Sequence, residues 1–297
     1  TSSSTDLKIS GDVLEYNTPS GGFTHTATTS GTVVMESQDT SFSSLFTFKD
    51  FDLANTVSNF RIGKTTNTEN VRITKSISIA GPIYIYGGDV YTDADVSISG
   101  GGATFEATDI LRFGASDTNV LVSTGSNPIT LKSDWIAFDG SGNSAGSGNT
   151  TFSLTGLLKI EPHSSNFSSE FLGGSDGVTG SELNWKGTVS EISSGVFNFV
   201  ADSESDFRHL TIQDYTRIGG FILNKDNSNT PVRIETHIDA NGLITIYGGN
   251  IILENDLYAR LSGADILVKG RGDLETIASR SVQTNNGDIV LWSNSDN

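Results

Sequence analysis

The sequence predicts an all-β protein built as a parallel β-helix, a solenoid in which short strands stack coil upon coil. Three observations support this. Strands of three to five residues, apolar at alternate positions, recur every six to twelve residues. The chain has 33 glycines, which suit many tight turns, and no sustained helical apolar stripe. Finally, the stretch Ile83-Tyr84-Ile85-Tyr86-Gly87-Gly88-Asp89-Val90 returns as Ile244-Thr245-Ile246-Tyr247-Gly248-Gly249-Asn250-Ile251.

The composition limits the classes of function. The 297 residues can bury a sizeable core, although only 35% of them are hydrophobic. A formal net charge of −17 disfavours nucleic acid as a partner, because phosphate binding needs clustered Lys and Arg. It also disfavours an anionic membrane surface, and no apolar run approaches the roughly 20 residues of a membrane span. The lack of cysteine excludes disulfides, thiolate metal sites and a cysteine nucleophile.

The predicted strands of the first half follow one another at short intervals. They occupy residues 7–9, 31–35, 45–48, 71–74, 77–79, 83–86, 96–98, 110–113 and 129–131. Alternation is clearest where Val71, Ile73, Ile77 and Ile79 fall on one face. Residues 136–156 break this rhythm. Within them, residues 139–149 are low in apolar content, and we expect an exposed loop or linker there.

The second half repeats motifs of the first in the same order. The motifs that begin at Gly31, Arg61, Val71 and Asp109 return as Gly187-Thr188-Val189, Arg217-Ile218-Gly219, Val232-Arg233-Ile234 and Asp265-Ile266-Leu267. The spacing of these matches predicts five extra residues between Gly219 and Val232. We therefore expect two copies of a block of about 150 residues, at 1–150 and 151–297, in one continuous solenoid. Each block would hold five or six coils of about 20 to 30 residues.

A pair of β-sandwiches is the competing fold, since sandwiches also need short strands with frequent turns. We favour the β-helix because glycine turns between three-residue strands suit compact coils better than long hairpins. A solenoid also leaves open strand edges at its two ends, which invite the stacking of further coils.

Several motifs resemble those of a known family. Residues 286–297, Asn-Gly-Asp-Ile-Val-Leu-Trp-Ser-Asn-Ser-Asp-Asn, and the motifs at 83–90 and 244–251 are similar to elements of very large secreted bacterial adhesins of the filamentous-haemagglutinin type. The resemblance covers mainly residues 59–135 and 215–297. It implies a right-handed parallel β-helix, export to the cell surface and a role in attachment, and it supplies no catalytic residue. We expect the chain to be a mature or excised piece of a longer protein.

Carboxylates are the first candidates for chemistry. Asp89, Asp93 and Asp95 lie close in sequence, and acid–base catalysis in a glycosidase needs two carboxyl groups held at a set separation. However, Asn250, Glu254 and Asp256 repeat the pattern in the second half, which favours a structural role because active sites are normally single.

Calcium is the one cofactor the sequence raises, because hard oxygens on flexible turns suit this ion. The weak candidate ligands are Asp139, Asn143, Asp202, Glu204 and Asp206. An ordinary polar loop is the alternative for both segments. His25, His163, His209 and His237 lack the spacing of a zinc site.

The tyrosines raise a different possibility. If they point outward, Tyr84 and Tyr86 could stack on sugar rings, although aromatic residues also pack well between neighbouring strands.

Three functions follow. The first is a structural segment of a secreted, cell-surface or fibre-forming adhesin, a non-enzyme that contacts surface glycans or neighbouring copies of itself end to end. The others are a carbohydrate-active β-helix enzyme (a polysaccharide lyase or glycosidase) and a glycan- or calcium-binding module. None of them involves nucleic acid or insertion into a membrane.

Overall fold

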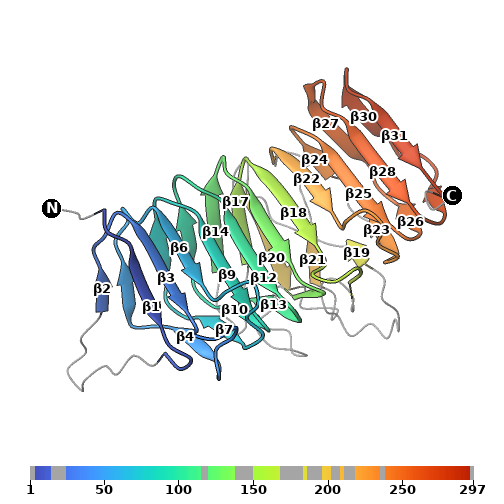
Figure 1. The fold of residues 1–297 in the computed structure, drawn as a ribbon. Coiled ribbons are helices and arrows are strands. Elements are labelled where there is room, and N and C mark those ends of the chain that lie inside the picture. The colour runs from blue at the N-terminus through green and yellow to red at the C-terminus, as the bar shows by residue number, and fades with distance from the viewer. Residues whose placement is uncertain are drawn as a thin grey trace.

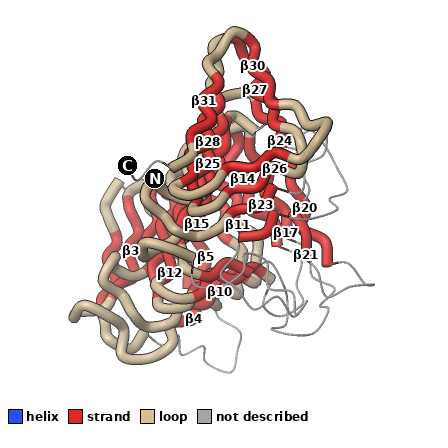
Figure 2. The backbone as a smooth tube through the Cα atoms, turned by 90° about the vertical axis from the view of Figure 1, so that its right-hand side faces the viewer, coloured by secondary structure: helices blue, strands red, loops and turns tan. Residues whose placement is uncertain are grey.

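Parallel strands stack along the whole length of the molecule in Figure 1, from β1 near the N-terminus to β31 near the C-terminus. This computed structural model describes residues 4–14, 25–114, 120–137, 150–167, 183–185, 196–201, 208–210, 218–234 and 238–294. Every regular element within these ranges is a strand (Figure 2). The predicted all-β solenoid is therefore confirmed; its handedness remains a prediction.

One eleven-stranded sheet, here called the main sheet, contributes one strand to each of the described coils. Its members are β1 (Leu7–Ser10), β3 (Thr32–Glu36), β6 (Asn59–Ile62), β9 (Ile83–Gly87), β12 (Ala103–Ala107), β15 (Ile129–Lys132), β18 (Leu157–Glu161), β22 (Gly220–Leu223), β25 (Ile244–Gly248), β28 (Ile266–Gly270) and β31 (Ile289–Trp292). Six of these described strands fall in residues 1–150 and five in 151–297.

Two further faces complete each coil. The second face holds β4 (Phe46–Phe48), β7 (Val71–Ile73), β10 (Val90–Thr92), β13 (Ile110–Phe113) and β16 (Trp135–Ala137), then β19 (Leu183–Trp185), β23 (Val232–Ile234), β26 (Ile251–Leu253) and β29 (Leu274–Thr276). The third face holds β8 (Ile77–Ile79), β11 (Val96–Ile98), β14 (Val120–Gly125), β17 (Thr150–Leu154), β20 (Val196–Ala201) and β21 (Arg208–Leu210), then β24 (Ile238–Ala240), β27 (Leu257–Ser262) and β30 (Val282–Asn285). A separate pair, β2 (His25–Ala27) and β5 (Phe51–Leu53), lies near the N-terminal end.

The strands pair in parallel except at one place. There β20 runs antiparallel to β17, and β21 runs antiparallel to β20. The same coil is unusually long, because Leu158 of β18 pairs with Phe221 of β22 although β19, β20 and β21 lie between them in the sequence. By contrast, Ile83 of β9 pairs with Ala103 of β12, and only β10 and β11 lie between these two strands.

The interior is filled by the alternate apolar residues of all three faces, as the sequence predicts. Ile83, Ile85 and Val90 are fully buried. Aromatic rings also stack along the interior: the Phe113 ring centroid lies 5.2 Å from those of Phe105 and Phe152, both edge-on. A continuous apolar core therefore runs through the coils.

Glycine is needed in the repeated motif for a reason other than the one expected. Neither Gly88 nor Gly249 adopts a left-handed backbone conformation. Instead, a Cβ on Gly88 would lie 2.2 Å from the carbonyl oxygen of Thr68 in the preceding coil, and one on Gly249 would lie 2.3 Å from that of Asn229. These glycines therefore allow successive coils to approach closely.

The register of the coils corrects two of the sequence matches. Ile62 belongs to the main sheet, whereas Ile218 forms a bridge with Ala240 on the third face. Likewise, Ile110 lies on the second face but Ile266 lies in the main sheet. These matches were wrong because short apolar motifs recur on all three faces, so sequence similarity alone does not identify equivalent positions.

Residues 60–98 and residues 221–259 do occupy equivalent positions. The difference in residue number between equivalent positions is the same throughout these two ranges. Phe60 pairs with Ile83 in the first part, and Phe221 pairs with Ile244 in the second. Five extra residues between Gly219 and Val232 are therefore not present. Duplication of the whole block remains a prediction.

Candidate functional site

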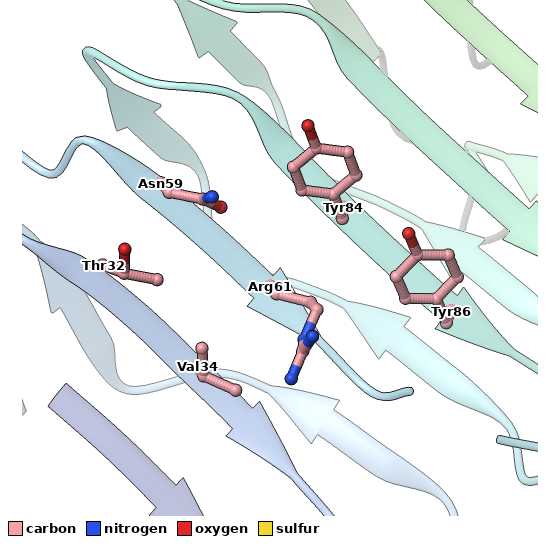
Figure 3. A pocket seen from close by; sticks show the side chains of 6 residues that line it. All are labelled: Thr32, Val34, Asn59, Arg61, Tyr84 and Tyr86. Carbon is pink, nitrogen blue, oxygen red and sulfur yellow. The ribbon is translucent and has the colours of Figure 1, made fainter. Parts of the chain in front are cut away.

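A shallow groove lies on the outward face of the main sheet, across β3, β6 and β9. Its volume is about 330 Å³, at the low end of ligand-binding pockets. The lining residues come in pairs from the three strands (Figure 3): Thr32 and Val34, Asn59 and Arg61, Tyr84 and Tyr86. Because side chains alternate along a strand, each pair is separated by one inward-facing residue.

The two tyrosines provide the aromatic wall of the groove. Both are half-buried and lie side by side along β9, with their hydroxyl groups pointing to the same side in Figure 3. Burial raises the pKa of Tyr86, the Glu106 carboxylate and Tyr84 raise it further, and the charge of Arg61 opposes them. Tyr86 is therefore a protonated hydrogen-bond donor at neutral pH.

A buried carboxylate holds the charged side of the groove in place. Glu36 at the end of β3 accepts a hydrogen bond from Arg61 and lies 2.6 Å from Lys8 Nζ of β1. Burial favours a raised pKa for Glu36, but hydrogen bonding and charge from Lys8 and Arg61 outweigh it, so the pKa lies below its usual value. Glu36 is therefore ionised at neutral pH, and it restrains Arg61 between Val34 and Tyr86.

Two polar atoms beside this cluster have unmet hydrogen-bonding capacity. Asn59 Oδ1 and Arg61 Nε are buried, and neither has a hydrogen-bond partner among the residues that the structure describes. One is an acceptor and the other a donor, and both belong to outward-facing residues of β6. A hydroxyl group both donates and accepts, so it has the chemistry to satisfy either atom.

Arg61 and Glu36 were not singled out as functional candidates by the sequence. The coil register brings Arg61 opposite Tyr84 of the next coil, and opposite Val34 of the preceding one. Outward alternation within each strand is visible in the sequence, but the identity of the neighbours across strands depends on coil lengths.

The acids Asp89, Asp93 and Asp95 bind residues of their own and of neighbouring coils. Asp93 Oδ2 accepts a hydrogen bond from Arg72 Nε at 2.7 Å, and Asp89 Oδ2 accepts one from the Tyr91 hydroxyl at 2.9 Å. Asp95 Oδ1 accepts the backbone N–H of Leu121 at 2.8 Å.

The counterparts of Asp93 and Asp95 in the second half make equivalent contacts. Glu254 accepts a hydrogen bond from Arg233, and Asp256 Oδ1 accepts the backbone N–H of Ser281 at 2.7 Å. The repeated acids therefore fix turns and neighbouring coils to one another, which agrees with the structural role expected for them.

The remaining predicted candidates are not brought together. Asp139, Asn143, Asp202, Glu204 and Asp206 lie outside the described residues, so calcium binding there remains a prediction. Within the described ranges, no three His, Asp or Glu side chains form a group that could hold a metal ion.

Two of the histidines have described side-chain contacts. His163 Nδ1 lies 3.2 Å from Glu106 Oε1 on the main sheet. The His25 ring stacks on Phe51 with a centroid separation of 6.5 Å. The two histidines lie on different parts of the solenoid.

The last coil presents a second unusual surface. β31 pairs with β28 on one side only, so its other backbone edge is open. Four large residues of β31 are 43–50% exposed: Ile289, Val290, Leu291 and Trp292. At the opposite end of the main sheet, β1 likewise pairs only with β3 among the described strands.

Comparison with protein-family models, with curated proteins and with solved structures gave no match. The likeness to haemagglutinin-type adhesins therefore rests on the sequence motifs alone. None of the described residues forms a helix with the length and apolar content needed to cross a membrane.

Proposed function

We propose that this chain is a structural segment of a large secreted adhesin, displayed on the cell surface or assembled into fibres, that mediates attachment or cell–cell contact. The observation that carries the proposal is the main sheet, a single parallel sheet that runs the length of the elongated molecule (Figure 1). Each coil binds its neighbours through backbone hydrogen bonds, so adding coils extends the molecule without changing its cross-section.

The exposed apolar end supports assembly of copies into a fibre. Because the main sheet is parallel throughout its described strands, the free edge of β31 can pair with the free edge of β1 in another copy in the same sense as any two internal coils. Such pairing would cover Ile289 and Leu291 and leave another open end, so the contact propagates instead of closing.

A concentration series tests the fibre role. We expect light scattering to show a mass that rises with concentration, and electron micrographs to show rods joined end to end. The double variant Ile289→Lys, Leu291→Lys should remain monomeric because it places charges on the stacking surface. The control Leu261→Lys alters an exposed residue of β27, away from the last strand, and should assemble normally. A wild-type protein that is monomeric at all concentrations would contradict this role.

The alternative of a carbohydrate-active enzyme has less support. Its proposed acids, Asp89, Asp93 and Asp95, have structural partners, and the counterparts of Asp93 and Asp95 repeat their contacts in the second half. Release of reducing or unsaturated ends from a polysaccharide panel would overturn the structural role in favour of this alternative.

A further inference from the structure

We infer that the groove across β3, β6 and β9 binds a neutral hexopyranose glycan, with one sugar ring lying against Tyr84 and Tyr86. This inference rests on the proposed role in attachment and gives that role a specific contact site. It is separate from the end-to-end contact, because the groove lies on the outward face of the main sheet and β31 lies at its end.

The shape of the groove suits a ring bound at the surface. Tyr84 and Tyr86 project from the same face of β9, and Arg61 and Val34 continue the row of Tyr84 across the neighbouring strands. The result is a shallow trough with an aromatic wall on one side and polar side chains on the other (Figure 3). The C–H face of a pyranose is apolar and packs on the electron-rich face of a tyrosine ring, while its hydroxyls remain at the rim.

The polar side of the groove matches hydroxyl groups. Asn59 Oδ1 needs a donor and Arg61 Nε needs an acceptor. Unsatisfied buried groups of this kind are destabilising, because each has lost its hydrogen bonds to water without replacement. A sugar presents vicinal hydroxyls that donate and accept at once, and the protonated Tyr86 hydroxyl adds a further donor. Small shifts of Asn59 and Arg61 toward the groove would place both within reach of such a ligand.

Charge selects a neutral glycan over an acidic one. The chain carries a net charge of −17, which repels polyanions at long range. The Arg61 guanidinium beside the groove is already paired with Glu36, and the Glu106 carboxylate acts on Tyr86 from the neighbouring strand. The Glu106 charge opposes the binding of a carboxylate or sulfate beside Tyr86.

The equivalent positions of the second half provide an internal comparison. The inward residues Phe60, Ile83 and Ile85 are identical to their counterparts in the second half, Phe221, Ile244 and Ile246. The groove residues are not: Asn59 corresponds to Gly220, Arg61 to Ile222 and Tyr84 to Thr245, and only Tyr86 has the same residue, Tyr247.

The difference between the outward residues of the two halves shows which of them the fold does not need. The strands β22 and β25 form the same part of the solenoid with Gly220, Ile222 and Thr245 on their outward face. Coil stacking therefore does not require Asn59, Arg61 or Tyr84. A ligand that contacts them explains why polar and aromatic side chains gather at this one position.

The second half also supplies fold-compatible substitutions for the test. Tyr84→Thr and Arg61→Ile each install the residue found at the equivalent position. Tyr247→Ala is the matched control, because it removes the counterpart of Tyr86 from a face that lacks the rest of the groove. The double variant Ile289→Lys, Leu291→Lys serves as the background, so that self-association does not affect the measurement.

The experiment is a glycan array of neutral and acidic oligosaccharides, followed by calorimetric titration of the best ligand up to millimolar concentrations. We expect neutral hexose oligosaccharides to bind, Tyr84→Thr to weaken binding at least tenfold, and Tyr247→Ala to leave it unchanged. Circular dichroism should be preserved in all variants, and the thermal midpoint in Tyr84→Thr and Tyr247→Ala. Arg61→Ile should lower the midpoint, because it removes an ionic partner of the buried Glu36.

Three results would overturn the inference: no binding to any glycan, binding that Tyr84→Thr does not weaken, or binding to acidic glycans alone. Each leaves the fibre role intact if the rods still join end to end. Conversely, a wild-type protein that is monomeric and binds glycan through Tyr84 would support the glycan site and contradict the fibre role.

Discussion

Substitution of Glu36 by glutamine tests whether the buried ion cluster stabilises the N-terminal coils. The Glu36 side chain is 6% exposed and joins three successive strands, because its cations come from Lys8 of β1 and Arg61 of β6. Glutamine keeps the shape but removes the charge. Both cations then lose their ionic partner, and one coil-to-coil contact is weakened on each side of β3.

The expected loss of stability depends on the burial of Glu36 and on the exposure of its two cationic partners. A hydrogen bond to a charged group contributes about 1.5–3 kcal/mol to stability when it is well shielded. Here Lys8 is 62% exposed and Arg61 is 38% exposed, so both regain water when the carboxylate is neutralised. We therefore expect Glu36→Gln to lower the free energy of unfolding by about 1–2 kcal/mol at pH 7.

The dependence on pH has a defined sign. The pKa of Glu36 is lowered in the folded protein, from a value of 4.5 without the fold. Stabilisation by its charge is therefore complete above that value and is lost as the pH falls through the folded pKa. Urea unfolding of the wild type and variant, followed by circular dichroism from pH 7 downward, should give a constant difference that narrows only below about pH 4.5. A difference that is absent at pH 7, or that widens in acid, would refute the reasoning.

Two further pairs of substitutions can be tested by the same unfolding measurements, and the addition of calcium can be tested by thermal melting. Phe113→Ala removes a fully buried ring with two edge-on partners and should lower the free energy of unfolding by about 3–5 kcal/mol. The control Leu45→Ala alters an exposed residue and should change it by less than about 0.5 kcal/mol; equal effects would contradict the continuous core. Gly81→Ala should destabilise the protein strongly, because its Cβ would lie 1.6 Å from the Ser58 carbonyl oxygen. Gly125→Ala has open space around it but a φ of 57°, and it should lower the free energy of unfolding by only about 1 kcal/mol. The reverse order would be inconsistent with the close approach of coils. Calcium should raise the thermal midpoint and chelator should reverse the shift if the acidic loops bind the ion, and an unchanged midpoint would end that prediction.

The fold was predictable because its physical basis is local. Alternation of apolar residues at Ile83 and Ile85 specifies which face of a strand is buried, and both residues are fully buried in the structure. Glycine pairs marked the corners, although Gly88 serves a close approach between coils and not a left-handed turn. Short strands with these signals are sufficient to identify a stacked, all-β architecture.

The sequence raised Tyr84 and Tyr86 as candidates, but the rest of the groove was not predictable because it depends on coil register. Successive coils differ in length, since the step along the chain from Ile83 to its partner Ala103 is shorter than the step from Ala103 to its next partner, Ile129. Without these lengths, the sequence does not reveal that Arg61 lies opposite Tyr84. The same lack of register caused Ile62 to be matched with Ile218, which lies on another face.

The repeated strand has inward residues that are the same in both copies and one outward residue that differs. This difference is why we propose a binding site on the outward face and not in the interior. Ile83 and Ile85 face the core, where stacking restricts each position to residues that fill the same space, and Ile244 and Ile246 repeat them. The outward positions meet no such restriction, since β25 stacks equally well with Thr245 in place of Tyr84. Residues that repeat inside and differ outside are what we expect of a scaffold whose outward rows provide the proposed contacts. For this chain, the row that contains Arg61 and Tyr84 is where mutation should change binding without changing the fold.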